Sequence, residues 1–203
     1  MRVAMRLFVA LNLSPEMRER LAALQDRLRC HQADVSWVRA ENIHVTLKFL
    51  GETEEKRLPR VRAALAEAAQ GQAAFSLEVE GVGSFGGRVP RVIWVGVERG
   101  AEPLVRLAGR IESVLAQVGF PKERRGFSPH LSLGRVRSPR NAEALLAGLL
   151  EARAERFGTV RASSFELMQS EFRPSGSVYT VVDRFPLAAE NDRGDGQGAP
   201  HAG

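Results

Sequence analysis

Two short segments of this 203-residue sequence carry the same pair of polar side chains at the same spacing. Residues 44–49 read HVTLKF and residues 130–135 read HLSLGR, so a histidine is followed two positions later by a hydroxyl in each. Side chains in a β-strand alternate between two faces, so each histidine shares a face with its hydroxyl while apolar residues face a core. The same alternation places Lys48 beside the first pair and Phe49 in the core.

Paired histidines beside hydroxyls are suited to chemistry on a phosphodiester. Histidine gives and takes a proton near neutral pH, so two of them can act as acid and base in one reaction. The hydroxyls can donate hydrogen bonds to a group that gains negative charge. One histidine would activate the attacking oxygen and the other would protonate the leaving oxygen. No metal is required, since the hydroxyls and nearby arginines can hold the phosphate oxygens.

Two other interpretations of these histidines remain open at this point. They could be metal ligands, but neither has a cluster of Asp, Glu or Cys nearby, and activity that survives chelation would exclude this. The protein could also bind RNA or nucleotides through a basic cleft without turning them over. Two complete His/hydroxyl pairs favour catalysis, because Arg or Lys would serve simple phosphate binding as well. His31, alone in a polar loop, and His201, in the tail, are not assigned a role.

The surrounding sequence predicts the same order of elements in each half of the chain: strand, helix, histidine strand, helix, strand. Phe8 precedes His44 by 36 residues, and Trp94 precedes His130 by 36. We therefore expect a duplicated β-α-β-α-β unit. The expected strands are about 7–13, 35–38, 44–51, 75–79, 92–97, 129–135, 164–170 and 178–185, and the expected helices are about 15–29, 54–69, 102–118 and 140–154.

The fold class that fits this pattern is α+β with mainly antiparallel sheets. The segments lack the long unbroken apolar strands of a buried parallel sheet. Two such units facing each other would place the two histidines across a shared groove. We expect one domain over residues 1–187, with lobes of about 1–90 and 91–187 between which strands could be exchanged. The Gly- and Asp-rich residues 188–203 are expected to be a disordered tail.

Composition is that of a soluble globular protein, and the charge is compatible with an anionic partner. Apolar residues make up 44% of the chain and charged residues 26%, and no stretch approaches membrane-spanning length. The formal charge of +5 is carried almost entirely by arginine, which favours bidentate phosphate contacts, although coding bias would produce the same usage. Cys30 is the only cysteine, so no intramolecular disulfide can form and we expect a cytoplasmic protein.

Five segments, two of which contain the motif histidines, together resemble one family. They are residues 5–11 (MRLFVAL), 37–51, 91–94 (RVIW), 127–130 (FSPH) and 179–185. The chain is similar to the 2H phosphoesterase superfamily, and within it to the bacterial and archaeal RNA 2′,3′-cyclic phosphodiesterases, also called 2′-5′ RNA ligases. The resemblance covers nearly everything except the tail.

This resemblance implies a bilobal fold, with two sheets, helices outside and a pseudo-twofold axis, around a cleft lined by both motifs. It also implies that His44 is the general acid for the leaving ribose 3′-oxygen and that His130 is the general base that activates water. Thr46 and Ser132 would hold the phosphate, and the product would carry a 2′-phosphate. The substrate would be RNA with a 2′,3′-cyclic phosphate end, such as a tRNA fragment, or a small cyclic nucleotide. Reverse 2′-5′ ligation would be secondary, and no cofactor, membrane partner or oligomer is expected.

Five further residues are candidates for substrate binding. Members of the family commonly have an arginine at the position of Arg135, yet strict alternation puts Arg135 on the face opposite His130 unless a bulge re-aims it. Phe8 and Phe127 are candidates for stacking on the terminal base, because single-stranded RNA is commonly recognised by aromatic stacking. Lys48 and Arg91 would add positive potential near the cleft.

Overall fold

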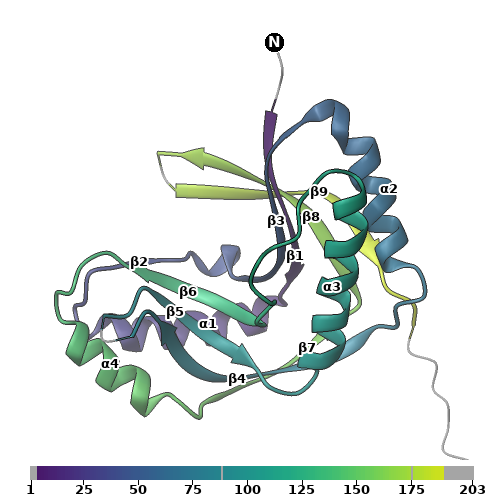
Figure 1. Ribbon diagram of the computed structural model, residues 1–203. Helices are drawn as coiled ribbons and strands as arrows, with labels where there is room; N and C mark the ends of the chain where they lie inside the picture. The colour runs from purple at the N-terminus through teal and green to yellow at the C-terminus, as the bar shows by residue number, and fades with distance from the viewer. Residues whose placement is uncertain (1–3, 88, 175, 190–203) are drawn as a thin grey trace, which may run out of the picture.

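The computed structural model describes residues 4–87, 89–174 and 176–189, which form one antiparallel sheet with helices on its outer side (Figure 1). The strands are β1 (Ala4–Asn12), β2 (Val35–Trp37), β3 (His44–Glu54), β4 (Phe75–Phe85), β5 (Val92–Val97), β6 (His130–Val136), β7 (Arg156–Ala162), β8 (Ser164–Arg173) and β9 (Gly176–Pro186). The α-helices are α1 (Pro15–Arg29), α2 (Leu58–Ala69), α3 (Ala101–Gln117) and α4 (Ala142–Glu151), with single 3-10 turns at η1 (Ala40–Asn42) and η2 (Glu55–Arg57).

The sheet consists of two groups of strands that touch at one point. Its order is β7-β4-β5-β6-β3-β1-β8-β9, with β2 added to β6, and these strands pair antiparallel. The α+β class and the antiparallel pairing are therefore confirmed. The two expected sheets are joined edge to edge by a single residue pair, Val45 with Leu131, between β3 and β6.

The two halves of the sequence are interleaved in space. Helix α1, which follows β1, packs against α4 and β7, whereas α3, which follows β5, packs against α2 and β3 (Figure 1). Strand β4 comes from the first half of the chain but pairs with β5 and β7 from the second. A division of the chain near residue 90 therefore does not separate the two groups of strands.

Two apolar clusters lie on opposite faces of β1. Leu7, Val9 and Leu11 belong to the main core between the sheet and the helices. Phe8 and Ala10 belong to a small second cluster with Met168, against which Tyr179 packs. Because neighbouring strand residues point to opposite faces, this second cluster lies on the face away from the helices. The face that carries the side chains of His44 and Thr46 therefore has an apolar base of its own.

Several boundaries differ from the expected ones. Strand β3 continues to Glu54, so α2 begins at Leu58 and not at residue 54. Strand β7 was not predicted; it lies at one edge of the sheet and pairs only with β4. Ala188, assigned to the tail, donates its N–H to the Gln72 carbonyl at 2.8 Å and accepts from Ala74 N at 2.7 Å, so it belongs to the fold. The rest of the predicted tail from residue 190 lies outside the described residues.

No helix in the described parts of the chain is long and apolar enough to cross a membrane.

Candidate active site

The junction between β3 and β6 brings the two histidine motifs together. Val45 and Leu131 face each other across the junction, and their exposed fractions of 1% and 0% show that both point into the core. In an antiparallel pair the residues on either side of a matched pair point to the opposite face, and the strands lie about 4.8 Å apart. His44 therefore lies beside Ser132, and Thr46 beside His130, on one face.

His44 is held as a neutral imidazole. Its Nδ1 lies 2.8 Å from the Asn42 carbonyl oxygen, which can only accept, so Nδ1 carries the proton. Its Nε2 then accepts from the Thr46 hydroxyl at 2.9 Å. The ring stacks on Phe8 with centroids 4.9 Å apart and meets the edge of Tyr179 at 5.5 Å. Because this burial removes the imidazole from water, the pKa of His44 falls to about 4, further lowered by the charge of Arg18.

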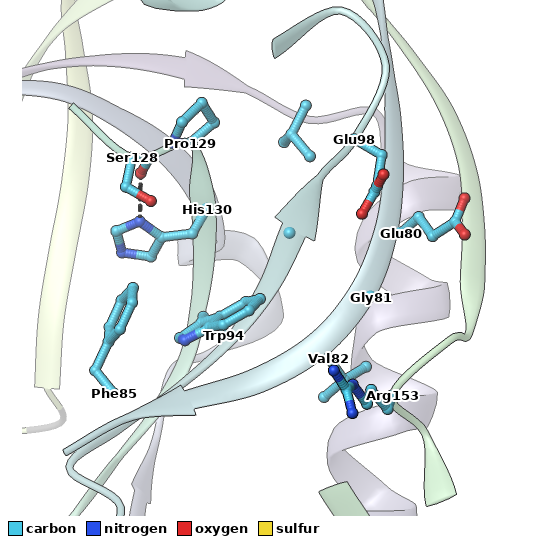
Figure 2. Close-up of a pocket in the computed structure, with 12 residues that line it drawn as sticks. Glu80, Gly81, Val82, Phe85, Trp94, Glu98, Ser128, Pro129, His130 and Arg153 are labelled. Atoms are coloured by element: carbon cyan, nitrogen blue, oxygen red, sulfur yellow. Dashed lines mark hydrogen bonds between the residues drawn. The ribbon is translucent and has the colours of Figure 1, made fainter. Parts of the chain in front are cut away.

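His130 has the same backbone anchor in a more open setting. Its Nδ1 lies 2.8 Å from the Ser128 carbonyl oxygen, which leaves Nε2 available to a substrate. The ring meets Phe85 edge-on at 5.2 Å and lies above Trp94 (Figure 2). These side chains line a pocket of about 360 Å³. The pocket extends from His130 toward Glu98 and Arg153.

A β-bulge turns Arg135 to the face that carries His130 and Ser132. Trp94 pairs with Ser132 but Ile93 pairs with Gly134, so Leu133 has no partner on β5 and the alternation shifts by one residue. Arg135 then pairs with Val92 and lies on the face of Ser132, where its side chain is exposed. The bulge resolves the ambiguity that strict alternation left. A phosphate contact by Arg135 stays a prediction.

A similar bulge exchanges the expected places of Lys48 and Phe49. Leu47 has no partner in the β1–β3 pairing, so Lys48 pairs with the core residue Val9 and is only 2% exposed. Phe49 pairs with Phe8 and is 63% exposed. The prediction that Lys48 shares the face of His44 and adds charge to the cleft is therefore wrong, as is the assignment of Phe49 to the core.

Lys48 instead ties β3 to the segment that leads into the second motif. Its Nζ lies 2.6 Å from Glu112 Oε1 on α3 and donates to the Pro121 carbonyl at 3.0 Å. The other carboxylate oxygen of Glu112 accepts from Glu123 N at 3.1 Å. This buried cluster holds the chain after α3, which continues to His130.

Of the aromatic candidates for base stacking, Phe8 is already covered. Its exposed fraction is 3%, and its ring is enclosed by His44 and by Tyr179, whose centroid is 5.0 Å away. The prediction that Phe8 stacks on a base is therefore wrong. Phe127 is half-buried against the main core and Arg91 is exposed just before β5. Their roles stay predictions.

Sequence reasoning missed the residues that surround the histidines. Tyr179 lies on β9, far from both motifs in sequence, and Phe85 lies beyond the expected strand 75–79 although it ends β4. The signal that could have found Tyr179 is its position at the start of the family-like segment 179–185. Within the described residues, no group of three or more His, Cys, Asp or Glu side chains comes together that could hold a metal ion.

The sequence model of a known family matches this chain twice, once in each half. The family is described as "LigT like Phosphoesterase", and the matched residues are 11–94 and 95–179. The chain belongs to this family. Each match contains one histidine motif, in agreement with the duplication expected from the sequence. The resemblance drawn from the motifs is confirmed.

Relatives of this LigT-like chain span nearly its whole length. The RNA 2′,3′-cyclic phosphodiesterase of Methanothermobacter thermautotrophicus is 34% identical over 183 residues, covering 90% of this chain and 98% of the relative. The protein of the same name from Archaeoglobus fulgidus is 37% identical, covering 86% and 96%. A crystal structure of a Thermus thermophilus protein superposes with a TM-score of 0.76 at 30% identity, covering 92% and 100%. Escherichia coli LigT complexed with 3′-AMP superposes with a TM-score of 0.74 at 26% identity, covering 91% and 99%.

Proposed function

We propose that this LigT-like protein hydrolyses 2′,3′-cyclic phosphate ends of RNA to 2′-phosphate ends by acid/base catalysis with two histidines. The observation that carries the proposal is the meeting of both His/hydroxyl pairs on one face, with each histidine oriented by a carbonyl 2.8 Å from Nδ1. The names of the relatives above support the substrate class. Reverse 2′-5′ ligation would use the same groups and be secondary. We place the protein in the cytoplasm as a monomer.

The geometry supports a role for each polar group. His130 Nε2 takes a proton from water, whose oxygen attacks phosphorus. The bond from phosphorus to the ribose 3′-oxygen breaks, and His44 gives that oxygen its proton. Thr46 and Ser132 donate hydrogen bonds to the phosphate oxygens, and Arg135, on the face of Ser132, neutralises part of their charge. The product keeps its phosphate on the 2′-oxygen.

His44 must gain a proton before it can act as the acid. With a pKa of about 4 it is neutral in the free protein near pH 7. A phosphate anion beside Nε2 favours the charged imidazolium and so raises the pKa. The Thr46 hydroxyl, which donates to Nε2 in the free protein, would then donate to the phosphate. Substrate binding is therefore expected to be coupled to proton uptake.

A hydrolysis assay tests the proposal. The substrate is a short RNA ending in a 2′,3′-cyclic phosphate, incubated with EDTA and with wild type, His44→Ala or His130→Ala. We expect the wild type to produce a 2′-phosphate end and both variants to lose this activity. The matched control is His31→Ala, because His31 lies against Gly148 of α4, away from both motifs. A wild type that binds the RNA but never hydrolyses it would contradict the proposal and indicate a binding module.

A further inference from the structure

The pocket beside His130 is larger than the hydrolysis proposed above requires. Its volume is about 360 Å³, and it extends from the His130 ring past Phe85 and Trp94 toward Glu98 (Figure 2). One water molecule occupies about 30 Å³. A nucleophilic water therefore needs only a small part of this space, and the whole pocket suits one small, partly apolar ligand.

The position of the pocket decides which reactant it can hold. In a displacement at phosphorus, the attacking and leaving oxygens lie roughly in line, on opposite sides of the phosphorus atom. The ribose that carries the cyclic phosphate lies on the side of His44, because its 3′-oxygen takes a proton from His44. The nucleophile enters on the side of His130, which lines the pocket. A ligand in the pocket is therefore placed to supply the attacking oxygen.

The walls of the pocket suit the base of a nucleoside. Phe85 and Trp94 line it with rings whose centroids are 5.4 Å apart, and single-stranded bases stack on such rings. Trp94 Nε1 is buried and has no hydrogen-bond partner among the described residues, so its N–H is available to an acceptor on a ligand. An added Cβ at Gly83 would lie 2.5 Å from the Trp94 ring, so only a glycine there leaves room for the indole.

The charged residues of the pocket favour a neutral ligand over a phosphorylated one. Glu80 and Glu98 line it together with Arg153. Glu80 is paired with Arg156, whose Nε lies 3.0 Å from Glu80 Oε2. The lining thus has no excess of positive charge to hold a second phosphate. A nucleoside whose 5′-oxygen is a free hydroxyl fits this lining better than a 5′-phosphorylated one.

We propose that the pocket beside His130 binds a nucleoside with a free 5′-hydroxyl, which replaces water as the nucleophile and is joined to the cyclic phosphate end. His130 Nε2 takes the proton of the 5′-hydroxyl, and the 5′-oxygen forms the bond to phosphorus. The bond from phosphorus to the ribose 3′-oxygen breaks, and His44 gives that oxygen its proton. The product is a 2′-5′ phosphodiester. The proposal rests on the function stated above and assigns the site of the second substrate in ligation.

The test measures the ratio of joined to hydrolysed product from one RNA with a 2′,3′-cyclic phosphate end. Two acceptor dinucleotides with a 5′-hydroxyl are compared at equal, subsaturating concentration, one intact and one with an abasic first residue. In the wild type the ratio should be about tenfold higher for the intact acceptor. Phe85→Leu should lower that ratio toward the value of the abasic acceptor, and Phe85→Tyr should keep it. The matched control is Phe172→Leu, which changes a phenylalanine of β8 that is 81% exposed and does not line the pocket, and it should keep the wild-type ratios.

The ratio separates binding in the pocket from an effect on His130. Joining and hydrolysis use the same two histidines, so a Phe85 substitution that acts only through the His130 ring would lower both products and leave the ratio unchanged. That result would overturn the proposal, as would equal ratios for the two acceptors in the wild type. A wild type that hydrolyses the RNA but never joins it would also overturn the proposal, and the proposed function would stand.

A binding measurement tests the site independently of turnover. In an NMR titration with the intact acceptor, the Trp94 Nε1–H signal should shift, while the signal of Trp37, which does not line the pocket, should stay in place. A wild type without hydrolytic activity would refute the proposed function, and this titration would still decide whether the pocket takes the acceptor. An unchanged Trp94 signal at saturating acceptor would overturn the proposal.

Discussion

The two histidine motifs share one backbone design but differ in their surroundings. Both histidines donate Nδ1–H to the carbonyl oxygen two residues earlier, at 2.8 Å in each case. His44 is enclosed by Phe8 and Tyr179, whereas His130 borders an open pocket. Duplication has therefore kept the hydrogen-bonding geometry of the two histidines, while the residues packed around each copy decide how far its ring is enclosed.

The two motifs also differ on the core side of the sheet, in the residue that follows the bulge. In β3 the residue after the unpaired leucine is Lys48, which reaches Glu112 and the Pro121 carbonyl. In β6 it is Gly134, where an added Cβ would lie 2.7 Å from Val35 Cγ1 and 3.1 Å from the Trp37 ring. One copy thus carries a buried ion pair, and the other leaves room for β2 to pack closely.

Removing either histidine should have the largest effect on activity. A positioned acid or base typically contributes a factor of about 10² to 10⁴, so His44→Ala and His130→Ala should each lower kcat on the cyclic-phosphate RNA by that order. Groups that act in one reaction step are not additive, so the double variant should lose little more than the worse single variant. Multiplicative losses in steady-state kinetics would mean that the two copies act independently.

Breaking the ion pair between Lys48 of the first histidine strand and Glu112 should have the largest effect on stability. Lys48→Met leaves the Glu112 carboxylate and the Pro121 carbonyl without a buried partner, so we expect a loss of about 3 kcal/mol in the free energy of unfolding. Urea denaturation measures it. Lys56→Met, which removes an exposed lysine paired with Glu54 at 2.6 Å, is the matched control and should change stability little. Equal effects of the two variants would contradict the structural role of Lys48.

The buried environment of His44 predicts how stability depends on pH. Its pKa is about 4 in the folded protein against 6.5 unperturbed, so between these values the unfolded chain binds more protons. The contribution of His44 to the free energy of unfolding is fully present above pH 6.5. It is lost as the pH falls toward 4, and the total loss is at most about 3 kcal/mol. Denaturation at several pH values should show this slope in the wild type and a smaller one in His44→Asn.

The same histidine should respond to a bound anion. We expect an NMR titration of the His44 ring to give a pKa near 4 in the free protein and a higher value with 3′-AMP or inorganic phosphate present. A His44 pKa that does not move when the ligand binds would argue against its role as the general acid.

Removing Arg135 should have the smallest of these effects. Because its exposed guanidinium is expected to contact the phosphate, Arg135→Ala should lower kcat/KM by about tenfold. Arg135→Lys should recover only part of the loss, since the planar fork of arginine is absent. Arg106→Ala is a matched control, because Arg106 is an exposed arginine on α3 that pairs with Glu102. Equal kinetics for Arg135→Ala and Arg106→Ala would show that Arg135 does not contact the substrate.

Short-range patterns in the sequence were sufficient for the class of fold and the central groups of the site. A helix was expected over residues 15–29, and the structure places α1 there with Ser14 at its N-cap, accepting from Met17 N at 3.3 Å. Alternation near His44 and His130 identified the polar face, because the register at Val45 and Leu131 is regular there. Such signals succeed because caps and alternation depend on residues close in sequence.

Only the tertiary structure decided what lies beyond the bulges and how the halves interleave. Phe8 and Trp94 have the same sequence spacing to the following histidine, yet Phe8 pairs with Phe49 and Trp94 with Ser132. A bulge is defined by the pairing of two strands, so no pattern within β3 alone could place Lys48 inside and Phe49 outside. The burial that lowers the pKa of His44 likewise comes from Phe8 on β1 and Tyr179 on β9, distant segments that meet only in the folded sheet.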